Sequence, residues 1–305
     1  MNSVTAAGTA AANGAAGTGR SLALACLYMD SSLDEAQPVQ LSVVIDGRLD
    51  GGRAHQVATL ASRLGLAGVW LRQPWWPPAG PSGAGADLLP ALGSCAGIRP
   101  GLVVDADAAD PDEADAGWLG RLVAVPAGLR IALTGTAAAV ARWQELIGRR
   151  PDLPVSQLVL PPGCGTAPLA VFVPCAPGRD LAAVVSAAAA DAAGRPVLAE
   201  VTVSVGRTAA EARARADTDE LFTLVGHPAR QGLFGTLEEC QATAAQLGHA
   251  GVTELVCYLP LASDLPDVLA QVRSIAIGAG VLRPGEPPSA PPPPPPGWGG
   301  RRITA

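Results

Sequence analysis

The chain has 305 residues, and its formal net charge of −6 argues against a nucleic-acid partner, which requires clustered cations. Apolar residues make up 49% of the chain, but much of that share is alanine. No run of 18 strongly apolar residues occurs, so no membrane-spanning helix is predicted.

Every one of the 21 basic residues is an arginine, and alanine, glycine and proline are in excess. This composition is typical of a high-GC genome and suggests an actinobacterial host. The cysteines are too far apart for a metal knuckle or a redox pair, so no metal site is expected. Buried free thiols in a reducing cytoplasm are the expected state, and export is not predicted.

The composition divides the chain into three parts. Residues 1–38 are rich in small and polar residues and are predicted to be disordered. Residues 283–305 contain six consecutive prolines, Pro291 to Pro296, and are predicted to form a disordered, extended tail. An alternative for this tail is a docking arm anchored by Trp298. Residues 39–282 are long enough for one large α/β domain.

From residue 39 onward, short apolar runs alternate with amphipathic stretches rich in alanine and leucine. Strands are predicted at residues 39–45, 68–71, 101–105, 129–133, 158–160, 169–173, 197–205 and 252–259. Helices are predicted at residues 53–64, 87–96, 137–147, 181–193, 208–224, 236–248 and 265–277.

Continuous apolar strands that alternate with helices are typical of a parallel sheet covered on both faces. The eight strands predict a single (β/α)8 barrel of the TIM type. A doubly wound open sheet is the alternative, because the pattern between residues 158 and 173 is poorly resolved.

The segment from Gly235 to Pro260 is the most informative part of the chain. Thr236 and Glu239 have the spacing of a capping box, which opens a helix by satisfying its first backbone N–H groups. Gly251 then precedes a buried strand at residues 252–259. A second capping box is predicted at Thr208 and Glu211.

Three segments in order resemble the luciferase-like monooxygenase superfamily, whose members are flavin- or deazaflavin-dependent oxidoreductases. Residues 235–239 read Gly-Thr-Leu-Glu-Glu and are similar to that family's Gly-Thr/Ser-Pro-Glu helix start before the final strand. Residues 194–213 resemble its GRdP stretch, with the strand and Glu-Ala-Arg helix that follow. Residues 57–70 more weakly resemble its helix and strand ending in Val-Trp.

The chain departs from this family just after the second strand. Many members carry an acid or histidine there, whereas this chain continues from Gln73 to Trp75 and Trp76. Barrel enzymes place their active sites at the carboxyl ends of strands. The tryptophans are therefore interpreted either as a wall for a flat cofactor or apolar substrate, or as a proline-stiffened lid packing on the rim. Gln73 is assigned to the same substrate-binding group.

Two glycine-containing loops are candidates for holding a cofactor phosphate. Thr134, Gly135 and Thr136 follow a strand and open a helix, whose first N–H groups and dipole favour an anion. Gly163 and Gly165 follow a shorter strand without a clear helix after it. The first loop is preferred, and a plain helix cap is its alternative.

Few candidates for acid–base chemistry stand at the ends of the predicted strands. Asp46 and Asp105 end the first and third strands and are predicted to bind substrate, although Asp46 could equally form a turn with Gly47. The three histidines, His55, His227 and His249, are predicted to be solvated or to cap helices. No catalytic residue is assigned, because a reduced flavin or deazaflavin would carry the chemistry.

The resemblance implies a cytoplasmic oxidoreductase that transfers hydride from coenzyme F420 in its reduced form, F420H2, or alternatively from FMNH2. Its substrate would be a small molecule or a modified peptide, since some family members act in natural-product pathways. A homodimer or a paired luciferase-like subunit is the expected assembly. The rival hypothesis is a degenerate barrel without a cofactor that serves as a partner subunit or scaffold, and it rests on the short middle of the chain and the missing polar group after Trp70.

Overall fold

The computed structural model describes residues 39–45, 51–73, 88–95, 97–125, 128–164, 170–174, 180–219 and 232–259. All of them lie in one compact unit, Ala36–Ala305. The tails predicted at residues 1–38 and 283–305 and the helix predicted at residues 265–277 lie outside the described residues. None of the described helices has the length and apolar character needed to cross a bilayer.

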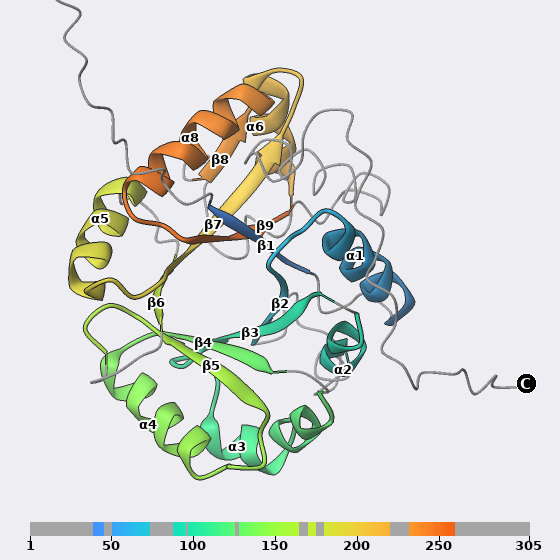
Figure 1. The fold of residues 1–305 in the computed structure, drawn as a ribbon, viewed down its shortest axis with the longest axis vertical. Helices are drawn as coiled ribbons and strands as arrows, with labels where there is room; N and C mark the ends of the chain where they lie inside the picture. The colour runs from blue at the N-terminus through green and yellow to red at the C-terminus, as the bar shows by residue number, and fades with distance from the viewer. Residues whose placement is uncertain are drawn as a thin grey trace, which may run out of the picture. The chain divides into compact units, whose positions relative to one another are not determined.

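Eight parallel strands close into a barrel, as the sequence predicted (Figure 1). Each strand pairs with the next along the chain, and the last pairs with the first through five registered residues, from Gln40 opposite Glu254 to Val44 opposite Tyr258. The strands of the barrel are β1 (Gln40–Val44), β2 (Gly68–Gln73), β3 (Arg99–Asp105), β4 (Leu129–Thr134), β5 (Val155–Leu160), β6 (Ala170–Val173), β7 (Val197–Val205) and β9 (Glu254–Tyr258).

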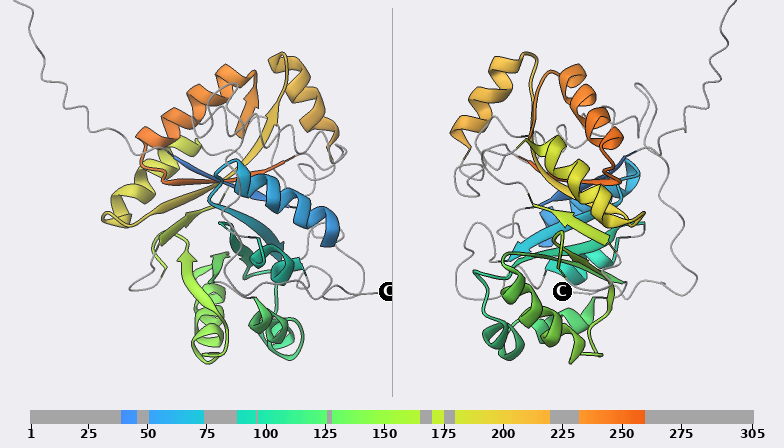
Figure 2. Two further views of the ribbon diagram at one scale, coloured as in Figure 1. Left: turned by 45° about the vertical axis from the view of Figure 1, so that its right-hand side comes forward. Right: turned by 90° about the vertical axis from the view of Figure 1, so that its left-hand side faces the viewer.

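Helices follow most strands and lie outside the barrel (Figures 1 and 2). They are α1 (Gly51–Arg63), α2 (Leu88–Gly93), α4 (Ala137–Gly148), α5 (Leu181–Ala192), α6 (Ala209–Thr218) and α8 (Leu237–His249). Within the described residues, the turn after β5 contains no helix, so β5 and β6 are joined by a short connection.

Three elements were not predicted. A short helix α3 (Pro111–Ala116) and a 3-10 turn η1 (Leu119–Ala124) fill the expected loop between β3 and β4. Asp110 caps α3 by accepting from the Asp112 N–H, and a proline occupies its first position, so the start signal was present in the sequence. Strand β8 (Gly232–Gly235) pairs with the end of β7, but four residues with two glycines give no readable pattern.

The predicted helix at residues 208–224 was too long. Helix α6 ends at Thr218, because Asp219 has extended backbone angles and its N–H bonds to the Ala216 carbonyl. The capping box of α8 is confirmed, with both hydrogen bonds between Thr236 and Glu239 present.

The second capping box is confirmed only in part. The Glu211 N–H donates to the Thr208 hydroxyl at 3.1 Å, but the Glu211 carboxylate accepts from the Arg207 N–H instead of the Thr208 N–H.

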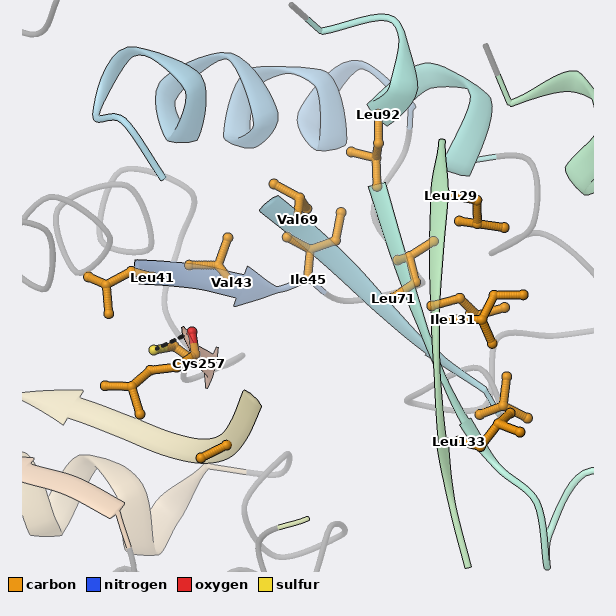
Figure 3. Close-up of a cluster of buried hydrophobic side chains, with 14 of the residues drawn as sticks. Leu41, Val43, Ile45, Val69, Leu71, Leu92, Leu129, Ile131, Leu133 and Cys257 are labelled. Atoms are coloured by element: carbon orange, nitrogen blue, oxygen red, sulfur yellow. Dashed lines mark hydrogen bonds between the residues drawn. The ribbon is translucent and has the colours of Figure 1, made fainter. Parts of the chain in front are cut away.

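Side chains alternate between two layers along each strand, as strand geometry requires. The outward ones pack against the helices in the larger apolar cluster. Figure 3 shows part of this layer, with Leu41 and Val43 from β1, Val69 and Leu71 from β2, and Leu92 of α2. Full burial of each such side chain contributes about 1.5–3 kcal/mol, which makes this layer the main support of the barrel.

Inward side chains form a second cluster in the barrel, with Trp70 at 0% exposure. The Arg130 guanidinium lies 4.3 Å from the centre of the Trp70 ring. Gly101 stands opposite Trp70 on β3, and a Cβ there would overlap the indole ring. The glycine thus makes room for the tryptophan that fills the middle of the barrel.

Candidate functional site

Four polar side chains from four strands meet toward the carboxyl ends of the barrel strands, at Arg72 of β2, Asp105 of β3, Glu200 of β7 and Tyr258 of β9. Arg72 Nη1 donates to Glu200 Oε1 at 2.7 Å and to the Tyr258 hydroxyl at 3.0 Å. Tyr258 also donates to Glu200 Oε1, and Arg72 Nη2 lies 3.7 Å from Asp105 Oδ2. We call these four residues the mouth network.

The mouth network is graded in exposure. Glu200 and Tyr258 are each 1% exposed, whereas the side chains of Arg72 and Asp105 are 18% and 32% exposed. Arg72 therefore connects the buried pair of Glu200 and Tyr258 to the accessible carboxylate of Asp105. With one cation and two carboxylates, the network carries a formal charge of −1 when both acids are ionised.

The buried groups in the network shift one another's protonation. Burial raises the pKa of Tyr258 well above its usual value, and the neighbouring Glu200 raises it further, although Arg72 opposes this. Burial by itself would lower the pKa of Arg72, but Tyr258 and Glu200 outweigh it and leave that pKa raised. At neutral pH Tyr258 is therefore a neutral phenol and Arg72 a permanent cation.

Of the residues assigned to substrate binding, Asp105 lies in this network. Gln73 ends β2 next to Arg72 and is in register with Val104. Asp46, Trp75 and Trp76 lie outside the described residues, so their assignment stays a prediction.

Thr134, Gly135 and Thr136 connect β4 to α4, as predicted, but the chain's own carboxylate binds there. Asp107 Oδ2 accepts from the Thr136 N–H at 2.8 Å, and Oδ1 accepts from its hydroxyl at 2.7 Å. Gly135 has φ +118°, and a Cβ on it would lie 2.8 Å from Asp107 Oδ2. Asp107 thus occupies the position at the start of α4 that an external anion would take.

Gly163 has φ +75° in the turn after β5, at the same end of the barrel, and a Cβ there would meet open space. Gly165 lies outside the described residues. The assignment of both glycines to a cofactor phosphate remains a prediction.

Sequence reasoning missed Arg72, Glu200 and Tyr258. A signal was available for Glu200, because a single carboxylate inside the apolar run of β7 has to be paired when it is buried. Arg72 and Tyr258 each sit near the end of a strand in the inward register, which the apolar runs alone do not reveal.

Two of the three histidines can be placed. His55 Nδ1 lies 3.4 Å from the Cys95 thiol, and burial raises the pKa of that thiol, so the pair is not poised as a nucleophile. His249 Nδ1 lies 2.7 Å from the Ala245 carbonyl at the end of α8, in agreement with a role at a helix end. His227 lies outside the described residues.

The described residues bring together no group of three or more His, Cys, Asp or Glu that could hold a metal ion. The mouth network itself presents hydrogen-bonding groups and charged side chains. It can bind a polar ligand, orient it and hold a proton on the Tyr258 hydroxyl.

The sequence matches no known family model, and no curated protein matches it. Solved structures do match its fold. The coenzyme F420 dependent tetrahydromethanopterin reductase from Methanopyrus kandleri is 12% identical with a TM-score of 0.53, and the match covers 79% of this chain and 97% of that one. An F420-dependent secondary alcohol dehydrogenase, solved with an F420-acetone adduct, is 11% identical with a TM-score of 0.53 over 79% and 99% of the two chains.

A riboflavin lyase solved with modified FMN and riboflavin is 12% identical, with a TM-score of 0.53 over 84% of this chain and 94% of that one. At these identities the likeness shows a shared fold. The (β/α)8 barrel that the sequence predicted is thereby confirmed as a fold shared with flavin- and F420-dependent enzymes.

Proposed function

We propose that the chain is an oxidoreductase of the luciferase-like type, in which F420H2, or alternatively FMNH2, transfers hydride to a small-molecule or peptide substrate at the mouth of the barrel. The observation that carries the proposal is the mouth network, placed at the strand ends where barrel enzymes bind their substrates. The fold shared with two F420-dependent enzymes and an FMN-bound lyase supports the choice of cofactor class.

Each member of the mouth network has a proposed task. Asp105 and Arg72, the more accessible pair, bind polar groups of the substrate. Glu200 fixes the Arg72 guanidinium and the Tyr258 hydroxyl from below. Because Tyr258 stays protonated at neutral pH, its hydroxyl donates to Glu200 and accepts from Arg72, and it thereby holds both side chains in position.

The loop at Thr134, Gly135 and Thr136 fits a cofactor phosphate poorly, because Asp107 already binds there. A phosphate at the start of α4 would have to replace the Asp107 carboxylate, which makes two hydrogen bonds to Thr136. Two anions cannot share this position without strong repulsion. The cofactor phosphate must therefore displace Asp107 or bind elsewhere.

The test is equilibrium binding of F420 and of FMN, measured separately for the wild-type chain and for Asp107→Asn. We expect binding at or below tens of micromolar for one cofactor. If its phosphate uses this loop, Asp107→Asn should bind about ten-fold more tightly, because one competing charge is removed. Asp112→Asn, an exposed acid in the first turn of α3, is the matched control. Failure of both proteins to bind either cofactor would refute the proposal.

A second candidate function is a barrel that binds no cofactor and acts as a partner subunit or scaffold. The observation that favours it is that Asp107 of the same chain binds in the loop at Thr134–Thr136, where a cofactor phosphate would otherwise bind. In that case neither cofactor should change the absorption spectrum of the purified chain, and the chain should be stable only when co-produced with a luciferase-like partner. A coloured cofactor that co-purifies in equal amount would rule this candidate out.

A further inference from the structure

The amino-terminal end of the barrel, opposite the mouth network, contains a pocket of about 530 Å³. The pocket lies among the starts of the strands, with Gln40 of β1, Arg99 of β3 and Glu254 of β9 in its wall. Its volume is within the range of small-molecule sites. This end of a (β/α)8 barrel ordinarily serves stability, so a pocket of this size there needs an explanation.

One residue that lines the pocket, Glu254, belongs to a buried ion pair. Arg130 Nη1 donates to both oxygens of Glu254, at 2.9 Å and 2.7 Å, and the two side chains are 1% and 5% exposed. Barrel interiors are ordinarily packed with branched apolar side chains. A buried ion pair costs desolvation that such packing avoids, so a member of such a pair in the pocket wall points to a use in binding.

The positive and negative charges around Glu254 do not balance. Arg99 Nη2 lies 3.9 Å from Glu254 Oε2, so two guanidinium groups share one carboxylate. Burial lowers the pKa of Arg130, and Arg99 lowers it further, while Glu254 only partly offsets both. Arg130 Nε is also buried without a hydrogen-bond partner. One more negative charge beside Arg99 would relieve this excess.

The wall of the pocket contains both polar and apolar side chains. Arg99 is 49% exposed, and its Nη2 donates to Gln40 Oε1. The amide of Gln157, whose Cα is in register with that of Arg130, makes no hydrogen bond to another described residue. Leu198 and Val252 contribute apolar side chains to the lining.

We propose that this pocket binds a small carboxylate with an apolar tail, such as a short fatty or aryl acid. Its carboxylate pairs with Arg99 and the Gln157 amide, because a planar guanidinium matches two carboxylate oxygens. Its tail packs on Leu198 and Val252. The pocket lies at the opposite end of the barrel strands from the mouth network, so its test does not depend on the proposed oxidoreductase activity.

Hexanoate is the probe, titrated calorimetrically into the full-length chain, with hexanol as the uncharged counterpart and acetate as the carboxylate without a tail. We expect hexanoate to bind at least about ten-fold more tightly than either. Arg99→Gln should weaken hexanoate by a similar factor, whereas Arg142→Gln, an exposed arginine on α4, should leave it unchanged.

Gln157→Glu provides a second, independent test. The new carboxylate supplies the missing charge beside Arg130, so hexanoate binding should be lost and the melting temperature should rise. Equal binding of hexanol and hexanoate, unchanged binding in Arg99→Gln, or no binding of hexanoate at about 10 mM would each overturn the proposal.

Discussion

Arg72 is the residue on which the mouth network depends. It contacts Glu200 at 2.7 Å, and it also bonds Tyr258 and approaches Asp105. Burying a carboxylate that is 1% exposed is costly unless a cation pairs with it. The arginine is therefore needed by the fold as well as by any ligand.

Replacing Arg72 with methionine should destabilise the chain by about 3–5 kcal/mol, because a buried carboxylate loses its counter-ion. Urea unfolding of the variant measures this loss. Arg142→Met, on the exposed face of α4, should change stability by less than about 0.5 kcal/mol. A loss below about 1 kcal/mol in Arg72→Met would contradict this role of the arginine.

At the scale of single elements, the packing of β2 against β3 depends on pairing a large residue, Trp70, with a glycine, Gly101. Trp70 projects into the barrel beside Gly101, which has no side chain to obstruct it. The face of the indole ring then packs against the Arg130 guanidinium inside the barrel. The spacing of these strands thus depends on a glycine.

Gly101→Ala should destabilise the chain by about 3 kcal/mol or more, because its methyl group would overlap the Trp70 ring and force it from its position. The measurement is the urea midpoint together with the near-ultraviolet circular dichroism of the tryptophans. Gly120→Ala in η1 is the matched control, since a Cβ there meets nothing within 4 Å. Equal effects of the two substitutions would contradict this account of β2 and β3.

The order of elements was predictable because parallel strands that are buried on both faces have continuous apolar sequences. All eight barrel strands were predicted in this way. Short elements were not, because β8 has four residues and two glycines. The site was largely missed for a related reason. Strand periodicity shows that Glu200 faces inward, but only the closure of the barrel brings it to Arg72, 128 residues earlier in the chain.

Asp107 shows a second limit of the sequence. The loop at Thr134–Thr136 was correctly placed between a strand and a helix, and its backbone is suited to an anion. Which anion it binds depends on a side chain that arrives from the loop after β3. No local pattern encodes that contact.

At the scale of the whole molecule, the absence of lysine simplifies the response to alkali. All 21 basic side chains are arginines, and the ordinary pKa of arginine lies well above that of lysine. Burial, with a contribution from Glu239, raises the pKa of Cys240 to about 11, and the pKa of Tyr258 is also raised. The folded chain thus holds these protons to a higher pH than the unfolded chain does.

Because the folded pKa of Cys240 is the higher one, its contribution to stability is complete below about pH 9 and is lost as the pH rises through 11. The free energy of unfolding should fall by about 2 kcal/mol over this interval on account of Cys240. Denaturant titrations at each pH measure the fall, and Cys240→Ala should show a shallower one. Parallel curves for the two proteins would show that this thiol is not responsible.

The pairing of β1 with β9 has a consequence for synthesis in the cell. Val44 has its partner at Tyr258, so 214 residues must be added after β1 before that edge can be covered. At the usual 5–20 residues per second, the ribosome needs about 10–40 s for this stretch. During that time β1 exposes unpaired backbone groups next to the apolar side chains of a half-built sheet, and an edge of this kind invites pairing with other chains. Nascent chains of this protein should therefore depend on chaperones until the last barrel strand has been made.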